Sequence, residues 1–209
     1  MNVNITSYCS IKKNQVYLNG KIHLAIAGEV PFKQFTNQLY KTLNMDYPKF
    51  FKLDNLCKLA LLTTEFLGIN ENITNPERTK IGVIVSNSVS SLDTDYNFNE
   101  SIKERKNYFP SPAIFVYSLP NILIGEICIR HKITGENAFF ISKEFNPKIF
   151  CNYVNTLFLS QRVHGCIIGW VDLYKDNYES FIILAQHKKY SNEKNIFEEN
   201  TLLKLYKGE

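Results

Sequence analysis

The sequence predicts an α/β protein whose mixed, five-stranded sheet is covered by helices on both faces. Apolar runs at residues 21–30, 81–85, 137–141, 166–174 and 180–189 alternate with segments of helical periodicity, which is the pattern of such a fold. The run at 81–85 is continuous and rich in β-branched residues, as in a central strand buried on both faces. Only residues 175–179 separate the last two runs, so we expect an antiparallel hairpin that makes the sheet mixed.

The first elements follow in chain order. Residues 1–20 are expected to form an irregular lead-in or an edge strand before the first predicted strand. Residues 31–43 have helical spacing of apolar side chains, and Pro31 stands at the start, where proline is tolerated. Residues 54–68 predict a stronger helix with Asp54 as N-cap and Gly68 just after its end.

Three further helices are predicted after the central strand, the first of them following a polar loop. Residues 88–98, after the central strand, are small and polar and predict a loop that caps the next helix; they would also let a ligand or another helix approach closely. A helix is expected from near Ser118 to residue 131, with Pro120 in its first turn. The clearest helix has Asn146 as N-cap and Pro147 first, and it is predicted to end before Gly165.

Composition limits the possible classes of protein. Hydrophobic residues make up 44% and charged residues 21% of 209 residues, which is typical of one soluble globular domain spanning 1–209. The net charge of +4 is too small to argue for nucleic acid. Apolar runs fall short of the roughly 18–20 residues that a membrane span needs, and no signal peptide is evident, so we expect a cytoplasmic protein.

Metal and cofactor chemistry has little support. The five cysteines are scattered without C-x-x-C spacing, and no two of the four histidines stand at i and i+4. His164 is close to Cys166 in sequence, but it falls at a predicted helix end while Cys166 starts a strand. The paired acids Asp93 and Asp95 are expected in a solvated loop or a cap. We therefore predict no metal and no cofactor.

The stretch from residue 137 to residue 150 predicts a strand, a sharp turn and the start of a helix. Such an elbow is a favoured place for a nucleophile, because the turn exposes one side chain and the helix N-terminus stabilises negative charge. Here the turn holds Ser142, Lys143, Glu144 and Phe145, with neither a cysteine nor a G-x-S-x-G motif. The residues alone do not decide between a lost nucleophile and a plain connection.

Three stretches, taken together, resemble the N-terminal half of β-ketoacyl synthases, which have the thiolase fold. Residues 47–67 look like the segment leading into the first buried helix of that family, and residues 81–98 like a strand followed by a small-residue loop. Residues 109–141, "FPSPAIFVYSLPNILIGEICIRHKITGENAFFI", are similar to the passage that runs into the strand before the nucleophile. The likeness covers roughly residues 20–190 and implies a thiolase-like half-fold.

The departures from the family are as informative as the likeness. Ketosynthases place a nucleophilic cysteine about nine residues beyond the glycine that matches Gly135, and that position here is Glu144. A carboxylate cannot replace a thiolate in forming an acyl thioester. The family also draws two catalytic histidines from its second half, which this chain is expected to lack. The resemblance therefore implies a subunit that does not condense acyl chains by itself.

The resemblance also implies a partner. In ketosynthase dimers the strand before the nucleophile pairs with its symmetry mate, so residues 137–141 are expected to face a full-length ketosynthase or a second copy, with acyl carrier protein binding through the complex. The chain resembles chain-length-factor subunits and short accessory subunits of aryl-polyene pathways, within fatty-acid and polyketide biosynthesis. Candidates for interface or tunnel lining are Asn121, Phe139, Phe140 and Ile141; the alternative for all four is ordinary core packing. The apolar residues at 56–62 and 149–158 are also expected to need covering.

Two other functions remain open on the sequence. One is an acyltransferase or condensing enzyme that uses Cys128 or Cys151, although both lie in apolar helices where a thiol is inert. The other is a homodimeric protein that binds acyl chains or acyl carrier proteins.

Overall fold

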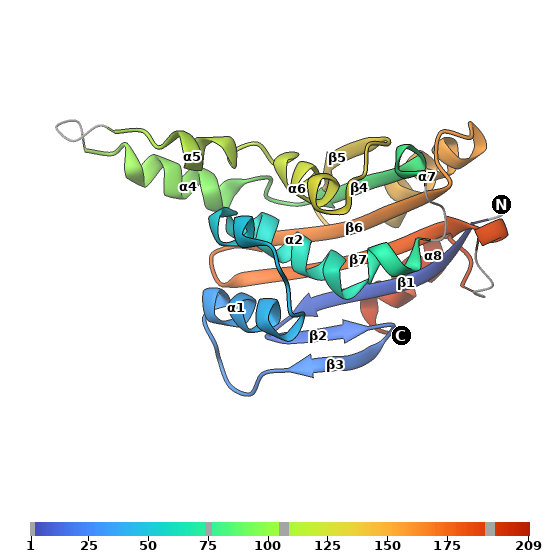
Figure 1. Ribbon diagram of the computed structural model, residues 1–209, viewed down its shortest axis with the longest axis horizontal. Coiled ribbons are helices and arrows are strands. Elements are labelled where there is room, and N and C mark those ends of the chain that lie inside the picture. Colours follow the sequence, from blue (N-terminus) through green and yellow to red (C-terminus); the bar gives the residue numbers. More distant parts are fainter. Residues whose placement is uncertain (1–2, 74–76, 105–108, 191–194) are drawn as a thin grey trace.

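A single mixed sheet of seven strands organises the chain, in the order β3-β2-β1-β7-β6-β4-β5. The computed structural model describes residues 3–73, 77–104, 109–190 and 195–209. The strands are β1 (Val3–Lys12), β2 (Gln15–Leu18), β3 (Lys21–Ala25), β4 (Ile81–Asn87), β5 (Asn137–Ile141), β6 (Gly165–Tyr174) and β7 (Asn177–His187). β5, β4 and β6 are parallel and the other pairs are antiparallel, including the β6–β7 hairpin (Figure 1). The predicted mixed α/β sheet is confirmed, but the predicted number of five strands is wrong.

The two additional strands, β1 and β2, lie where a lead-in was expected, and a β-bulge explains why their pattern is hard to read. The pairing of β1 with β7 shifts register between Ile5 and Ser7. Before the shift Val3 and Ile5 face one side of the sheet; after it Cys9 and Ile11 face the other. A bulge inserts one residue and thereby breaks the period-two alternation by which strands are recognised.

Helices cover both faces of this sheet, as predicted. They are α1 (Phe32–Thr42), α2 (Asn55–Phe66), α3 (Ile69–Asn72), α4 (Leu92–Ser101), α5 (Pro112–Val116), α6 (Ile122–His131), α7 (Pro147–Leu159) and α8 (Glu199–Lys207). α1, α2 and α6 pack on one face, where they share a core with Val83, Val85 and Ile182. α7 and α8 pack on the other face over Ile84, Ile168 and Ile183. None of the helices in the described ranges is long and apolar enough to cross a membrane.

The predicted helix caps are confirmed at Asp54, Gly68 and Asn146, but not at Gly165. The carboxylate of Asp54 accepts a hydrogen bond from the backbone N–H of Cys57, and Gly68 has the positive φ of 59° expected just after α2. Asn146 caps α7 as predicted, but Gly165 begins β6 and does not end the helix. The predicted loop at 88–98 is largely α4, whose first turn contains Asp93, because acidic side chains stabilise a helix N-terminus.

The apolar helix surfaces that seemed to need an external partner are covered within the chain. In α2 every residue from 56 to 62 except Lys58 is buried against its own sheet and helices. In α7 the buried stripe includes Phe150, Val154 and Leu157, while Lys148 and Asn152 point outward. This expectation was wrong, because α1, α6 and α8 close both faces.

Candidate functional site

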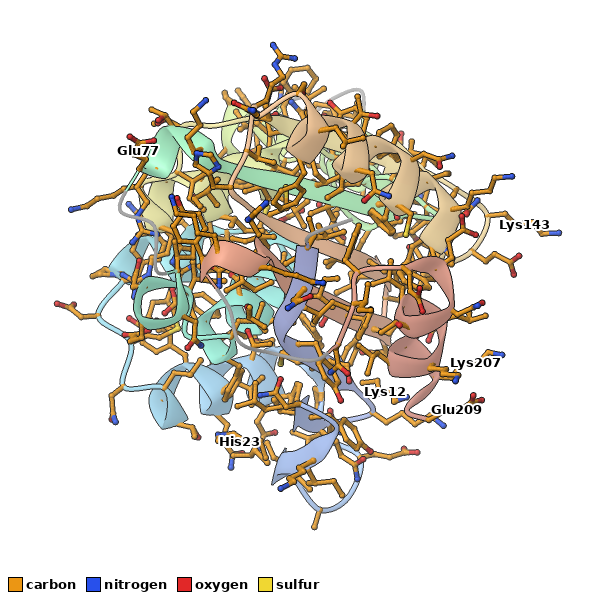
Figure 2. All side chains as sticks on the ribbon, turned by 90° about the vertical axis from the view of Figure 1, so that its right-hand side faces the viewer. Lys12, His23, Glu77, Lys143, Lys207 and Glu209 are labelled. Carbon is orange, nitrogen blue, oxygen red and sulfur yellow. The ribbon has the colours of Figure 1, made fainter. Side chains whose placement is uncertain are left out.

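The elbow between β5 and α7 has the predicted strand–turn–helix form. The backbone N–H of Ser142 donates to the carbonyl of Asn87 at 2.9 Å, which holds the end of β5 beside β4. The Ser142 hydroxyl donates to the carbonyl of Glu144 at 2.7 Å, and Asn146 caps α7 two residues later. These bonds fix a tight turn in which Glu144 is exposed and Lys143 extends away from the ribbon (Figure 2).

Beside Glu144, aromatic side chains occupy the space next to the elbow. Phe145 is buried, and its ring stacks on that of Tyr206 from α8 with centroids 4.3 Å apart. The same ring meets Phe181 of β7 edge-on at 5.6 Å. An exposed carboxylate next to a packed aromatic cluster has no arrangement for attacking an acyl thioester.

No histidine is placed to serve this elbow as a general base. All four histidines belong to the described residues. His131 ends α6 and His164 precedes β6, so both lie at the opposite end of the parallel strands from the elbow. His187 ends β7 at that same far end, and His23 is on β3 at the other edge of the sheet (Figure 2).

The five cysteines are free; Cys128 is partly buried and the other four are buried. Burial raises the pKa of the Cys128 thiol to about 11 and that of Cys151 to about 12. Burial likewise raises the pKa of Cys9, Cys57 and Cys166 well above the ordinary value. Because the thiolate is the reactive form, these raised pKa values disfavour the reactive form near neutral pH.

β5 forms an open edge of the sheet: in the described part of the chain it pairs with β4 alone. The N–H of Val83 donates to the carbonyl of Glu136, and the N–H of Ser142 donates to that of Asn87. A strand directs alternate peptide groups to opposite sides. The peptide groups of Asn137, Phe139 and Ile141 therefore point away from β4, where they are free to pair with another strand.

The predicted contact residues are spread over this edge. Phe139 packs against the α1–α2–α6 core, whereas Phe140 packs against the α7–α8 core and meets Tyr153 edge-on at 5.3 Å. Ile141 is 61% exposed. Asn121 is exposed immediately before α6, and its carbonyl accepts the N–H groups of Ile124 and Gly125. The structure thus brings three of them together on β5 and places Asn121 at the N-cap of α6.

A cleft of about 310 Å³ between α2, α4 and α5, with both polar and apolar lining residues, was not foreseen. Burial raises the pKa of Asp54, whose carboxylate accepts a hydrogen bond from the Thr94 hydroxyl at 2.7 Å. Asp93 accepts bonds from the Asn55 amide at 3.3 Å and the Lys175 N–H at 2.9 Å. Because these bonds satisfy both carboxylates, the cleft is a structural junction. Among the described residues no group of three or more His, Cys, Asp or Glu side chains could hold a metal ion.

Two ion pairs on α6 were also missed. Glu126 is buried and lies 2.7 Å from the ammonium of Lys49, and Arg130 binds Glu65 of α2 at 2.6 Å. The sequence does not indicate which residue pairs with a polar side chain of an apolar helix, because Lys49 and Glu65 are far from α6 in the chain. The Arg130–Glu65 pair joins α6 to α2, and the Glu126–Lys49 pair joins α6 to the 3-10 segment Pro48–Lys52 that precedes α2.

Comparisons with known proteins locate the fold. No protein-family model and no curated protein sequence matches the chain. Among solved structures, the ishigamide ketosynthase/chain length factor aligns with a TM-score of 0.67 at 13% identity, over 93% of this chain and 64% of that one. A ketosynthase (ApeO) in complex with its chain length factor (ApeC) from Xenorhabdus doucetiae aligns with a TM-score of 0.55 at 12% identity, over 90% and 79%.

A third similar structure is the AntDE:AntF complex, a type II polyketide synthase acyl-carrier protein with its ketosynthase bound to the hexaketide. It aligns with a TM-score of 0.64 at 9% identity, over 90% of this chain and 63% of that one. The chain therefore spans less than two thirds of the first and third of these structures. It has the thiolase-type fold that ketosynthases and chain length factors share.

Proposed function

We propose that this chain is a non-catalytic, chain-length-factor-like subunit that pairs with an active ketosynthase. In this role it completes the partner's acyl tunnel and limits chain length in a cytoplasmic pathway of the fatty-acid or polyketide type; an aryl-polyene pathway is its most specific form. The observation that carries the proposal is the elbow after β5, where the exposed side chain is that of Glu144; four of the five thiols are buried and that of Cys128 is partly buried.

The two free edges of the sheet favour β5 as the pairing strand. β3 exposes Lys21 and His23 along the other edge, and charged side chains on an edge strand discourage pairing. No residue of β5 is charged. An uncharged edge with free peptide groups and a large exposed isoleucine is suited to strand addition.

Exposed apolar side chains continue from this edge toward α5. Phe115, Val116 and Leu119 are between 48% and 55% exposed, and α5 has no buried residue. α4 and α5 project together beyond the end of the sheet (Figure 1). Large exposed apolar surfaces generally mark interfaces, so we assign this arm, Asn121 and β5 to one contact surface.

Similar proteins support a ketosynthase as the partner. One of the aligned structures is a ketosynthase/chain length factor, and another is a ketosynthase in complex with its chain length factor. By analogy, Phe139, Phe140 and Ile141 would contact the partner or line the tunnel, and acyl carrier protein would bind through the complex.

Co-expression tests the proposal. The chain is expressed with a ketosynthase encoded beside it, and the tagged ketosynthase is purified. We expect both chains to elute together at the mass of a heterodimer. Separate elution, with this chain a stable monomer, contradicts the proposal; a stable dimer of this chain alone favours the homodimeric binding protein.

Two matched substitutions locate the contact. Ile141→Lys on β5 should abolish co-elution, because a lysine on an edge strand blocks pairing. Ile22→Lys on β3 is the control, since Ile22 is 62% exposed and Ile141 61%. Equal loss, or equal retention, with both variants would show that β5 is not the pairing edge.

A further inference from the structure

The outer face of α6 provides a second layer of contact above β5. α6 contacts both β4 and β5, so it lies over the open edge of the sheet. Arg130 binds Glu65, which fixes the side of the helix that faces α2. Leu123 and Ile127 are buried in the core between the helix and the sheet. The helix therefore has one free side, directed away from α2 and from the core beneath the helix.

Gly125 lies at the middle of that free side. At about 100° per residue, Leu123 and Ile127 are each about 160° around the helix from Gly125. Asn121 and Ile129, four residues before and after it, are on the same side and exposed, Ile129 at 60%. A three-residue stripe at i, i+4 and i+8 thus contains no charged side chain.

Among the residues that the structure describes, none requires glycine at this position. Around a Cβ placed on Gly125, no heavy atom of the described residues lies within 4 Å, apart from its chain neighbours and its own helix backbone. Its φ is not among the positive values. Glycine inside a helix costs about 1 kcal/mol relative to alanine. A residue with this cost and no internal role leaves room for a close approach from outside, as small residues do where helices cross closely.

The pairing of β5 determines what can approach. This step rests on the proposed function. When β5 pairs antiparallel with the equivalent strand of a partner across a two-fold axis, Phe139 lies at the axis, opposite its counterpart. Only this register lets the outward peptide groups of Asn137, Phe139 and Ile141 all form hydrogen bonds. Strands are about 4.8 Å apart, so a helix above β4 and β5 is about 5 Å from the axis. The partner's corresponding helix is then about 10 Å from α6, which is the distance of packed helices.

We infer that α6 crosses the equivalent helix of the ketosynthase partner at Gly125, with Asn121 and Ile129 on either side. The occupant is a helix face of small or apolar residues, because the α6 stripe offers no charge to pair. The contact joins the β5 ladder below it, so strand and helix layers form one continuous interface. Because Gly125 has no side chain, it determines how closely the two helices, and with them the two subunits, approach.

Bulky substitution at Gly125 tests this inference in the purified complex. We expect Gly125→Leu to raise the Kd for the ketosynthase by at least about tenfold, because an added side chain between packed helices is overpacked. The thermal midpoint of the isolated chain should not fall, since the Cβ position is open. Asn152→Leu, on the exposed face of α7, is the matched control and should leave Kd unchanged.

Ile129→Lys is a second variant that does not depend on the glycine. Its side chain is exposed, so the fold should tolerate lysine while the complex weakens. If the wild-type complex forms and both α6 variants bind as tightly as Asn152→Leu, the helix contact is wrong although the β5 pairing stands. If no wild-type complex forms, the proposed function itself fails.

Discussion

Thiol chemistry at the level of single residues separates a subunit from an enzyme. Burial raises the pKa of Cys128 to about 11 and that of Cys151 to about 12. We predict that the folded chain shows no fast-reacting thiol toward Ellman's reagent at pH 8, whereas all five react after denaturation. Mass spectrometry after incubation with an acyl thioester should find no acylated cysteine. Stoichiometric labelling or acylation of Cys128 or Cys151 in the folded chain would revive the enzymatic alternative.

His131 should make the stability of the fold depend on pH. It is 2% exposed, and burial lowers its pKa to about 4, although Glu65 lies 3.7 Å away and opposes the shift. Nearby Arg130, Arg78 and Glu71 have smaller effects of both signs. In the unfolded chain His131 binds a proton near pH 6.5. Its contribution to the free energy of unfolding is therefore fully present above that pH and is lost as the pH falls toward 4.

The loss attributable to His131 is about 3 kcal/mol over this window. Urea unfolding between pH 7 and pH 4.5 should show a steeper decline for the wild type than for His131→Gln, which does not titrate. Equal slopes for the two proteins would mean that His131 gains its proton equally easily in the folded and unfolded states.

Gly125 within α6 and Gly135 in the connection between α6 and β5 have opposite roles, and substitution should reveal them. A Cβ on Gly135 would lie 2.3 Å from the carbonyl oxygen of Ile81 and 2.7 Å from that of Thr79, so backbone must move. We predict that Gly135→Ala destabilises the chain by about 2 kcal/mol or more. Gly125→Ala should stabilise it by up to about 1 kcal/mol, because α6 gains helix propensity without a clash. Urea unfolding measures both, and equal effects would contradict these packing assignments.

At the level of elements, sequence patterns identified the helices better than the strands. Asp54 and Asn146 were recognised as caps because a side-chain acceptor before an apolar stripe is a local signal. Residues 1–20 were left open between an irregular lead-in and an edge strand, because the bulge near Ser7 reverses the alternation of β1. β2 has only four residues and one fully buried side chain, Val16. α4 was mistaken for a loop because Thr94 is its only buried residue, so no apolar stripe marks it.

For the whole molecule, the elbow and its edge strand could be predicted, but the covering of the helices could not. The strand at 137–141 and the turn at Glu144 are adjacent in sequence, so local patterns place them together. The burial of 56–62 depends on α1 and α6, and that of α7 depends on Tyr206 and Leu202 of α8. Tertiary packing decides which distant element covers a surface, and an apolar stripe in the sequence gives no information about that packing.

The open edge of the molecule predicts an alternating pattern of amide hydrogen exchange. In the free chain the N–H groups of Asn137, Phe139 and Ile141 should exchange rapidly, while those of Ala138 and Phe140 are protected by the ladder with β4. Adding the ketosynthase should protect the first three, because an antiparallel partner strand bonds the groups that point outward. Residue-resolved exchange by NMR on the isotopically labelled chain measures this.

The Ile141→Lys variant supplies the control, since it should keep the free-chain pattern in the presence of the partner. Protection of all five amides in the free chain, or no change in the three on binding, would show that the partner does not add a strand to β5.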